Sequence, residues 1–378
     1  MRLFKRLSQL WVTIAVGLMG VLVWRLNKLD ILPGKYFWLL VAGVGVVAIV
    51  MLFVNFWQKT KMKLRFLLTL VATALFVVGL LGISKINTMD DFLDQNFGVV
   101  EPEDGTAVEV NIDINVTVEP FTIYVSGVDT RAEDLRERAL SDVNIVLTVN
   151  PQTHQVAMTF IPRDYYVYLH GVGTDLRDKL THAGTVGGVA LSKATVEDVL
   201  GVKIDHYIKV NFSFVRKLVD MVGGITLVSD TDFTAWTDKS CHFTVGKNTV
   251  DGKCALAFAR ERMSYQSGDN HRGENQEQVI ARLVEKLSQS DLLKHYDELL
   301  AALDGTFETS LSRGDITNLV KMQLADNPAW TAEAVNLRGS GSMQSTYSYP
   351  GQALYVSFPD EASVATAKAK IEAVLEAK

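Results

Sequence analysis

Cysteine is scarce in this chain, and several common catalytic signatures are missing from it. Only two of the 378 residues are cysteines, and no His/Cys quartet at ligand spacing surrounds them, which argues against a structural zinc site. The sequence also has no G-x-x-x-x-G-K-[ST] loop, no G-x-S-x-G elbow and no H-E-x-x-H helix. These absences argue against a P-loop nucleotidase, an α/β-hydrolase and a zinc metalloprotease.

Charged residues are missing from three long stretches near the N-terminus, residues 8–24, 36–57 and 66–83. Each stretch has about the length that a helix needs to cross roughly 30 Å of hydrocarbon. Three such runs in succession are rare in soluble proteins, so the alternative of buried core helices is disfavoured. The sequence therefore predicts three transmembrane helices within residues 1–84, a membrane anchor whose first span is retained and not cleaved.

Basic residues at the ends of these runs predict the orientation of the anchor. Arg2, Lys5 and Arg6 precede the first run, and Lys59, Lys61, Lys63 and Arg65 fill the loop before the third. By the positive-inside rule the N-terminus and this loop are cytoplasmic. Three crossings then place the rest of the chain outside the cell membrane, as a multi-pass protein with an extracellular domain.

The part outside the membrane is acidic. Of 37 basic and 43 acidic residues, ten basic and one acidic lie in the first 83 positions, which leaves 27 basic and 42 acidic for the remainder. Affinity for nucleic acid depends largely on neutralising phosphates. Nucleic acid is therefore not expected as a partner.

The pattern beyond the anchor predicts an α/β domain. Residues 85–119 are acidic with little periodicity and are expected to form an extracellular stalk or linker, with an alternating run near its end. From residue 120 to 378 strands and helices alternate, which favours a single mixed-sheet domain with helices packed on it. Strands are expected at 121–125, 143–149, 155–161, 206–210, 225–228, 332–337 and 353–358, and helices at 132–140, 180–200, 212–221, 271–288, 292–303, 314–324 and 361–377.

The two cysteines, Cys241 and Cys254, flank a segment that reads as a short hairpin with a turn near 246–248. Such a hairpin would bring the two thiols together, and an oxidising exterior would favour a disulfide. Two free, partly buried thiols are the alternative.

Carboxylates and arginines gather at the ends of predicted strands, where α/β sheets place their ligands. Asp129 follows the first strand, Asp142 opens the second, and Arg163 closes the third. A carboxylate pair beside arginines is suited to a divalent cation that also binds phosphate oxygens, and a free carboxylate can accept a proton.

A second cluster supplies donors for phosphate: Arg260, Arg262, Arg272 and Gln276. Arg260 and Arg262 can act together only if the segment between them is extended or turning. Arg272 and Gln276, four residues apart, share one face of a helix. Guanidinium groups bind phosphate through two parallel hydrogen bonds, so the set could hold a pyrophosphate. Taken alone, each of these residues is more often a solvated surface residue than part of a binding site.

Five ordered segments, residues 124–131, 141–144, 160–164, 255–262 and 268–276, resemble the LytR-CpsA-Psr family. Residues 321–324 and 347–359 resemble its capsule-type members, as do the three spans. Asn275 departs from the Arg-Gln pair that many relatives carry.

The resemblance implies a phosphotransferase that binds polyprenyl (pyro)phosphate in a hydrophobic tunnel and transfers a lipid-linked capsule or anionic wall polymer to peptidoglycan. It assigns Asp129 and Asp142 to metal binding and catalysis, with magnesium, or manganese, as cofactor. It also assigns Arg163 to catalysis and phosphate binding, and it assigns Arg260, Arg262, Arg272 and Gln276 to phosphate binding. Two alternatives remain open: a polyprenyl-pyrophosphate phosphatase, and a non-catalytic lipid-binding regulator of envelope polysaccharide genes.

Overall fold

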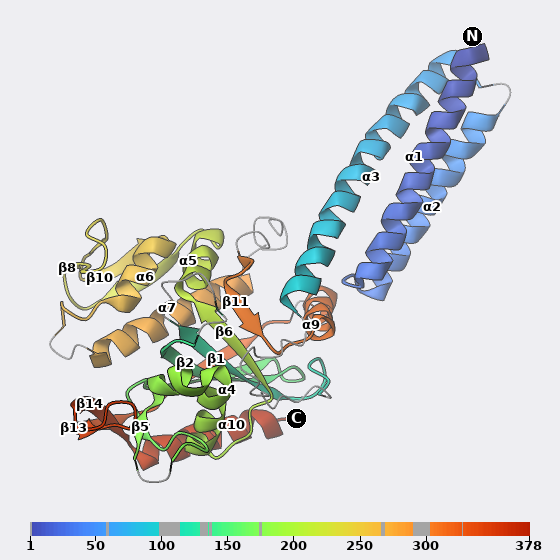
Figure 1. The fold of residues 1–378 in the computed structure, drawn as a ribbon. Coiled ribbons are helices and arrows are strands. Elements are labelled where there is room, and N and C mark those ends of the chain that lie inside the picture. The colour runs from blue at the N-terminus through green and yellow to red at the C-terminus, as the bar shows by residue number, and fades with distance from the viewer. Residues whose placement is uncertain are drawn as a thin grey trace. The chain divides into compact units, whose positions relative to one another are not determined.

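The computed structural model describes residues 2–57, 60–97, 114–128, 135, 138–173, 176–265, 269–289, 303–326 and 328–378. The chain divides into two compact units, one of residues 1–95 with 316–327 and one of residues 96–315 with 328–378. Figure 1 shows the elements of both units. Asp129, the helix expected at 292–303 and most of that at 132–140 lie outside the described residues.

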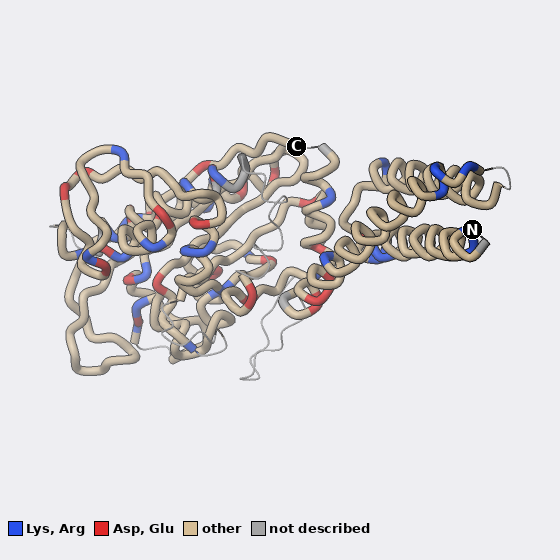
Figure 2. Tube along the Cα trace, turned by 90° about the horizontal axis from the view of Figure 1, so that it is seen from above, with Lys and Arg blue, Asp and Glu red and all other residues tan. Residues whose placement is uncertain are grey.

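The first unit contains the three predicted apolar helices. They are α1 (Arg2–Leu29), α2 (Gly34–Phe56) and α3 (Met62–Asn96), and each is long and apolar enough to cross a membrane. Charged residues lie mainly toward the ends of the helices (Figure 2). Val12, Ala15, Met51 and Ala72 form a small apolar core between them. The prediction of three N-terminal apolar helices is confirmed.

Polar side chains link the three helices at one end of the bundle. Arg65 of α3 is 2% exposed, and its guanidinium donates hydrogen bonds to the carbonyl oxygens of Asn55 and Trp57 at 2.8 and 2.9 Å. These carbonyls belong to the last turn of α2, where backbone oxygens lack partners within the helix. Arg65 thereby caps α2 and joins it to α3.

Helix α9 (Arg313–Asp326) belongs mostly to this first unit. Lys321 Nζ lies 2.5 Å from Asp30 Oδ2, and Lys35 Nζ donates a hydrogen bond to the carbonyl of Ala325 at 2.9 Å. A segment more than 200 residues away in sequence therefore contacts the turn between α1 and α2.

The second unit is built on a mixed sheet of six strands. Their order is β11 (Phe307–Thr309), β6 (His206–Asn211), β1 (Phe121–Val128), β2 (Ser141–Asn150), β3 (Gln155–Ile161) and β12 (Thr331–Asn336). β1 runs parallel to β6 and β3 runs parallel to β12, whereas β2 is antiparallel to both β1 and β3. The expected mixed sheet with helices is confirmed.

Helices lie on both sides of this sheet. α4 (Leu180–Leu200) and α10 (Glu361–Glu376) pack on one face around a core that includes Tyr124, Val146 and Ile371. Figure 1 shows α5 (Phe212–Met221), α6 (Gly252–Arg260) and α7 (Asp269–Gln289) on the other side. The remaining strands form four two-stranded pairs: β7 (Ile225–Ser229) with β10 (Gly246–Val250), β8 (Phe233–Thr234) with β9 (His242–Phe243), β4 (Tyr166–Val167) with β5 (Asp178–Lys179), and β13 (Gly339–Ser345) with β14 (Ala353–Pro359).

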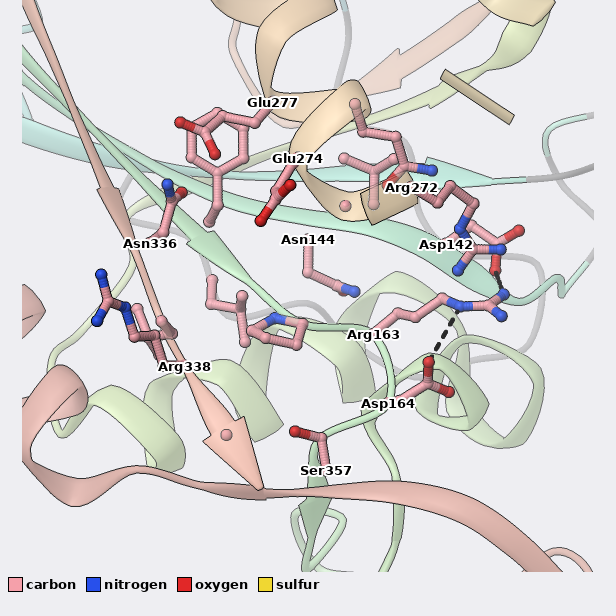
Figure 3. Close-up of a pocket in the computed structure, with 18 of the residues that line it drawn as sticks. Asp142, Asn144, Arg163, Asp164, Arg272, Glu274, Glu277, Asn336, Arg338 and Ser357 are labelled. Carbon is pink, nitrogen blue, oxygen red and sulfur yellow. Dashed lines mark hydrogen bonds and ion pairs between the residues drawn. The ribbon is translucent and has the colours of Figure 1, made fainter. Parts of the chain in front are cut away.

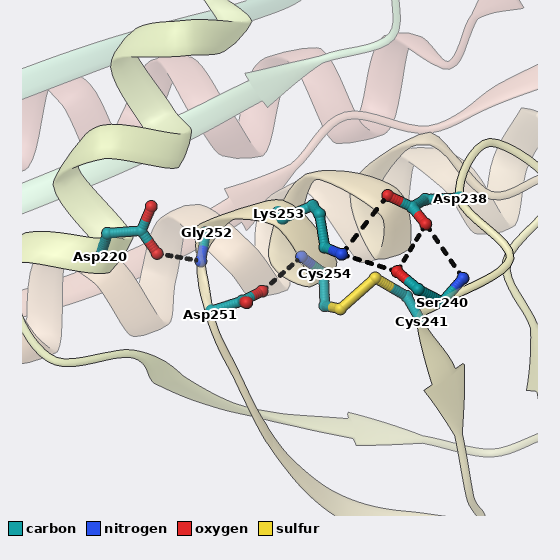
Figure 4. The surroundings of a disulfide bond; sticks show 8 residues. All are labelled: Asp220, Asp238, Ser240, Cys241, Asp251, Gly252, Lys253 and Cys254. Atoms are coloured by element: carbon teal, nitrogen blue, oxygen red, sulfur yellow. Dashed lines mark hydrogen bonds and ion pairs between the residues drawn. A yellow bond between two sulfur atoms is a disulfide. The ribbon is translucent and has the colours of Figure 1, made fainter.

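Cys241 and Cys254 form a disulfide bond (Figure 4), so the alternative of free thiols is wrong. The hairpin expected between them is also wrong. β9 pairs with β8 and β10 pairs with β7, both earlier in the chain, and Gly246 begins β10 instead of forming a turn. The disulfide joins Cys241, the residue directly before β9, to the first turn of α6, beside an apolar core with Phe233, Phe243 and Phe258.

Candidate functional site

The strand directions bring several chain ends to one edge of the sheet. Because β1, β6, β3 and β12 all run in the same sense and β2 runs opposite, their carboxyl ends meet the beginning of β2. A cleft of about 490 Å³ lies at this edge. Its walls come from the start of β2, the end of β3, the end of β12, the first turns of α7 and strand β14 (Figure 3). The volume lies within the range of ligand sites, about 300–1,000 Å³.

Asp142 and Arg163 form an ion pair at one end of the cleft. Arg163 Nη1 lies 2.7 Å from Asp142 Oδ1, and the two side chains are 17% and 12% exposed. Arg163 Nε also lies 3.5 Å from Asp164 Oδ2, and Asp164 Oδ1 accepts a hydrogen bond from Lys179 Nζ at 2.9 Å. The guanidinium is therefore held from two sides, which reduces the conformational freedom that it would lose on binding a phosphate.

Helix α7 supplies the opposite wall. Arg272, which is 6% exposed, and Gln276 both line the cleft, as expected for residues one turn apart. Asn275 is buried, and its Nδ2 donates a hydrogen bond to the carbonyl of Phe258 in α6 at 3.1 Å. Asn275 thus fixes α7 against α6. This hydrogen bond explains why position 275 carries an amide side chain although it faces the protein interior.

Arg260 and Arg262 lie outside the residues that line the cleft. Arg260 ends α6, and its Cζ lies 4.9 Å from the ring centroid of Phe212, which follows β6 at the same sheet edge. Glu261 has extended backbone angles, φ −70° and ψ 131°, so the segment between the two arginines is not helical. The extended backbone at Glu261 therefore allows the side chains of Arg260 and Arg262 to act together.

The structure thus brings Asp142, Arg163, Arg272 and Gln276 into one cleft. Sequence reasoning missed the lining residues on the far side: Glu274, Glu277, Asn336, Arg338, Tyr355 and Ser357. Asn336 is the last residue of β12, so the strand-end pattern could have identified it. Nothing in the local sequence signals that Tyr355 and Ser357 of β14 reach the same cleft.

Buried hydrogen-bonding groups hold the segments around the cleft. Burial raises the pKa of Tyr165 to about 12, so its hydroxyl stays protonated and donates to the carbonyl of Arg338 at 2.5 Å. Burial also favours the neutral form of Asp178, but hydrogen bonds from His182 and Ser348 outweigh it, and the pKa of Asp178 is lowered. Its oxygens lie 2.6 Å from His182 Nδ1 and 2.5 Å from Ser348 Oγ.

Comparison with protein families gives a match to the LytR_cpsA_psr family over residues 95–359. The matched region contains both walls of the cleft. The chain belongs to the LytR-CpsA-Psr family. Among its relatives is a protein of Enterococcus faecalis named polyisoprenyl-teichoic acid–peptidoglycan teichoic acid transferase TagU, 34% identical over 258 residues, which cover 68% of this chain and 81% of TagU.

Solved structures of LytR-CpsA-Psr proteins share the fold. The crystal structure of Bacillus subtilis TagV has a TM-score of 0.57 and 26% identity, with 69% of this chain and 98% of TagV covered. TagT, solved with bound octaprenyl pyrophosphate lipid, has a TM-score of 0.52 and 24% identity, with 70% and 93% covered. At that identity the likeness to TagT supports the fold alone.

Proposed function

We propose that this LytR-CpsA-Psr protein is a membrane-anchored phosphotransferase that transfers a polyprenyl-pyrophosphate-linked glycan to peptidoglycan. The observation that carries the proposal is the cleft at the sheet edge, where the Asp142–Arg163 pair faces Arg272 and Gln276. The name of the TagU relative, a teichoic acid transferase acting on peptidoglycan, supports the same reaction class. The glycan is a capsule polysaccharide or an anionic wall polymer; the relatives favour the wall polymer.

In the proposed reaction a peptidoglycan hydroxyl attacks the phosphorus that carries the sugar. A new oxygen–phosphorus bond forms, the bond to the bridging oxygen breaks, and polyprenyl phosphate leaves with that oxygen. Arg163 and Arg272 stabilise the negative charge that develops on the leaving phosphate. Arg260, beside Phe212 at the same sheet edge, and Arg262, two residues further on, are proposed to assist them. Asp142 accepts the hydroxyl proton, with Asp129 as the second candidate.

Magnesium, or manganese, fits the donor chemistry of this end of the cleft. Among the described residues no group of three or more His, Cys, Asp or Glu side chains is arranged to hold a metal. Magnesium needs only one or two carboxylates when phosphate oxygens and water complete its shell. Asp142, one oxygen of which is bound by Arg163, and Asp129 would hold it. Bound there, the ion would neutralise phosphate charge.

We further propose that the second unit lies outside the cell membrane, with the N-terminus in the cytoplasm. The basic residues before α1 and between α2 and α3 support this orientation. Single cysteines placed at Lys61 and at Lys247, in a background with Cys241→Ser and Cys254→Ser, should differ in labelling by an impermeant maleimide on intact cells. Labelling at position 247 and protection at 61 is expected; the reverse pattern would contradict the orientation.

The activity is tested with the full chain in nanodiscs, a polyprenyl-pyrophosphate-linked saccharide, peptidoglycan fragments and magnesium. Glycan joined to peptidoglycan, lost on chelation and in Arg272→Ala, is the expected result. Release of the phosphorylated glycan to water without labelled peptidoglycan would identify a phosphatase instead. Lipid binding without turnover would identify a non-catalytic regulator.

A further inference from the structure

Tyrosines gather on the surface of the second unit outside the cleft. Six of the eleven tyrosines of the chain lie within residues 165–168 and 347–355, and the two segments meet where Tyr165 forms a bridge with Ser357. Three of these tyrosines, Tyr168, Tyr347 and Tyr349, are 42–50% exposed and do not line the cleft. Large side chains with apolar faces that gather at one exposed place mark an interaction site.

Arg177 is held against two of the tyrosine rings. The pairing of Tyr166 with Lys179 in β4 and β5, continued by two residues, places Arg177 opposite Tyr168. The Cζ atom of Arg177 lies 4.9 Å from the ring centroid of Tyr168 and 6.0 Å from that of Tyr166, within the range of cation–π contacts. Such a contact uses the face of the guanidinium, so the N–H donors in its plane point toward its edges, where a ligand can accept from them.

The loop between β13 and β14 is fixed by a buried carboxylate. Asp178 accepts hydrogen bonds from the backbone N–H and the Oγ of Ser348 at 2.9 and 2.5 Å. Tyr347 N–H donates to the carbonyl of Arg177 at 3.0 Å, and its Cε2 lies 3.7 Å from the position that a Cβ of Gly173 would take. Ser348 is therefore anchored inward, and the tyrosines on either side of it are held at the surface.

Further contacts join the loop to β4 and α4. Tyr166 Oη donates a hydrogen bond to the carbonyl of Ser345 at 2.8 Å, and the ring centroid of Tyr349 lies 5.4 Å from that of His182. Figure 1 shows β5 beside the β13–β14 pair. We call the exposed set Tyr168, Arg177, Tyr347 and Tyr349 the tyrosine platform. Because its members are held before any ligand arrives, little conformational entropy is lost on binding.

The tyrosine platform lies a short distance along the chain from the cleft. Tyr168 follows Arg163, which lines the cleft, by five residues. A fully extended chain advances at most 3.3–3.6 Å per residue, so the two backbones are no more than about 18 Å apart. A few linked sugar residues span that distance. One polysaccharide strand can therefore contact the tyrosine platform while one of its sugars enters the cleft.

The tyrosine platform has the groups that an N-acetylated sugar strand with acidic peptides would contact. Each tyrosine ring offers a rigid apolar face with a polar edge, on which the C–H face of a pyranose can stack. Arg177 donates hydrogen bonds to acetamido and peptide carbonyls and to peptide carboxylates. Peptidoglycan carries all of these groups.

The acceptor needs such a surface more than the donor does. In the proposed reaction the donor is held through its pyrophosphate by the arginines of the cleft. The acceptor brings an uncharged hydroxyl, so its affinity must come from parts of the strand remote from the reacting atom. An acceptor sugar inside a strand also has neighbours on both sides, and they need a surface that leads away from the cleft.

We infer that the tyrosine platform is a docking surface for the peptidoglycan strand, which holds the strand while one of its sugars reacts in the cleft. The inference rests on the proposed function, because that function supplies the acceptor. The docking itself requires no lipid donor, and it can therefore be measured separately from transfer.

The first test measures binding of soluble peptidoglycan strands of several disaccharide units, with their stem peptides, to the full chain in nanodiscs without lipid donor. Tyr168→Ala, Tyr347→Ala and Arg177→Gln should each weaken this binding about fivefold to tenfold, the size expected for one lost aromatic or charged contact. Binding of polyprenyl pyrophosphate should stay at the wild-type affinity in all three variants.

The second test measures transfer with two acceptors, the same strands and a single disaccharide-peptide. With strands, the three variants should raise the KM for the acceptor about fivefold to tenfold and leave kcat and the KM for the lipid donor unchanged. A single disaccharide is too short to occupy the cleft and the tyrosine platform together. Its kcat/KM should therefore be the same in wild type and in the variants.

Matched variants separate these outcomes from general damage. Tyr168→Phe keeps the ring and should bind strands nearly as wild type does. Arg282→Gln removes another arginine, 47% exposed, on α7 outside the cleft and the tyrosine platform, and should leave both measurements unchanged. Thermal unfolding of Tyr168→Ala and Tyr347→Ala should match wild type, since both side chains are exposed.

Three results have distinct meanings. If the platform variants bound strands as tightly as wild type, the inference would be wrong, while transfer by wild type would still support the proposed function. If they weakened binding of a free anionic wall polymer but not of strands, the surface would serve the polymer, and the inference would again be wrong. If wild type bound strands through these tyrosines but transferred no glycan, the docking surface would stand and the proposed function would fail.

Discussion

Arg163 Nη1 and Asp142 Oδ1 lie 2.7 Å apart, although the residues belong to different strands. Asp142 is the second residue of β2, and Arg163 follows the end of β3 by two residues. The antiparallel pairing of Asn144 with Ile161 brings them to the same sheet edge. The pair therefore depends on the register of β2 against β3, and any change that moved the register would separate the two groups.

Arg163→Ala should lower the rate of glycan transfer by about 10²-fold or more, the usual cost of removing one preorganised donor from a developing charge. It also leaves Asp142 without the group that orients it. Arg163→Lys keeps a charge but loses the planar fork, so an intermediate rate is expected. Transfer from a labelled lipid donor to peptidoglycan, measured with the full chain, provides the comparison. A variant Arg163→Ala with more than half of the wild-type rate would show that the chemistry occurs elsewhere.

Asp178 should make the stability of the second unit depend on pH in the acidic range. Its pKa is lowered in the folded protein, so the stabilisation is present above the unfolded pKa, about 4, and is lost as the pH falls through the lower folded value. Asp178→Asn removes this titration. The difference in unfolding temperature between wild type and Asp178→Asn should therefore shrink as the pH falls below about 4. A difference that stayed constant from pH 7 to pH 3 would contradict the assignment.

Several elements were predictable because their signals are local. β3, α4 and α5 have the bounds expected from the sequence, and the side chain of Asn211 caps α5 by accepting a hydrogen bond from Phe214 N–H. Asp142 and Arg163 were also predictable from the sequence. They lie at the ends of two strands that are consecutive in the chain and adjacent in the sheet, so the local pattern also indicates that the two side chains are close in space.

Other features depend on pairings between distant segments. The hairpin expected between the cysteines failed because β10 pairs with β7 and β9 with β8, and a local alternating pattern does not reveal which partner a strand takes. The far wall of the cleft was missed for the same reason. Tyr355 reaches it only because β13 and β14 fold back beside Tyr165, which forms an isolated bridge with Ser357.

The disulfide should stabilise the lobe formed by α5, α6 and β7–β10. Closing a loop with a sequence separation of 13 is worth about 3 kcal/mol in the chain-entropy account. Cys241→Ser with Cys254→Ser should lower the free energy of unfolding by about that amount, measured by denaturant titration. A reducing agent should destabilise wild type and leave the double variant unchanged. Equal sensitivity of both proteins would mean that the bond does not contribute.

Glu261 follows the last residue of α6 and lies between Arg260 and Arg262, where it organises the backbone. It is completely buried; its Oε2 accepts a hydrogen bond from Trp236 N–H at 2.6 Å, and its Oε1 accepts from the N–H groups of Met263 and Ser264 at 2.8 and 3.1 Å. One carboxylate thus ties the segment after α6 to a separate loop. Removing it leaves several buried donors unsatisfied, at about 1–3 kcal/mol each.

Glu261→Ala should therefore lower both the unfolding temperature and the affinity for polyprenyl pyrophosphate, although Arg260 and Arg262 remain in the chain. Glu261→Gln is the sharper variant. Its amide keeps one acceptor oxygen but turns an NH₂ group toward a backbone donor, so either Trp236 or the pair Met263 and Ser264 loses its partner. An intermediate loss in both measurements is expected. If Glu261→Gln lost stability while lipid affinity stayed at the wild-type value, Glu261 would support the fold without positioning the arginines.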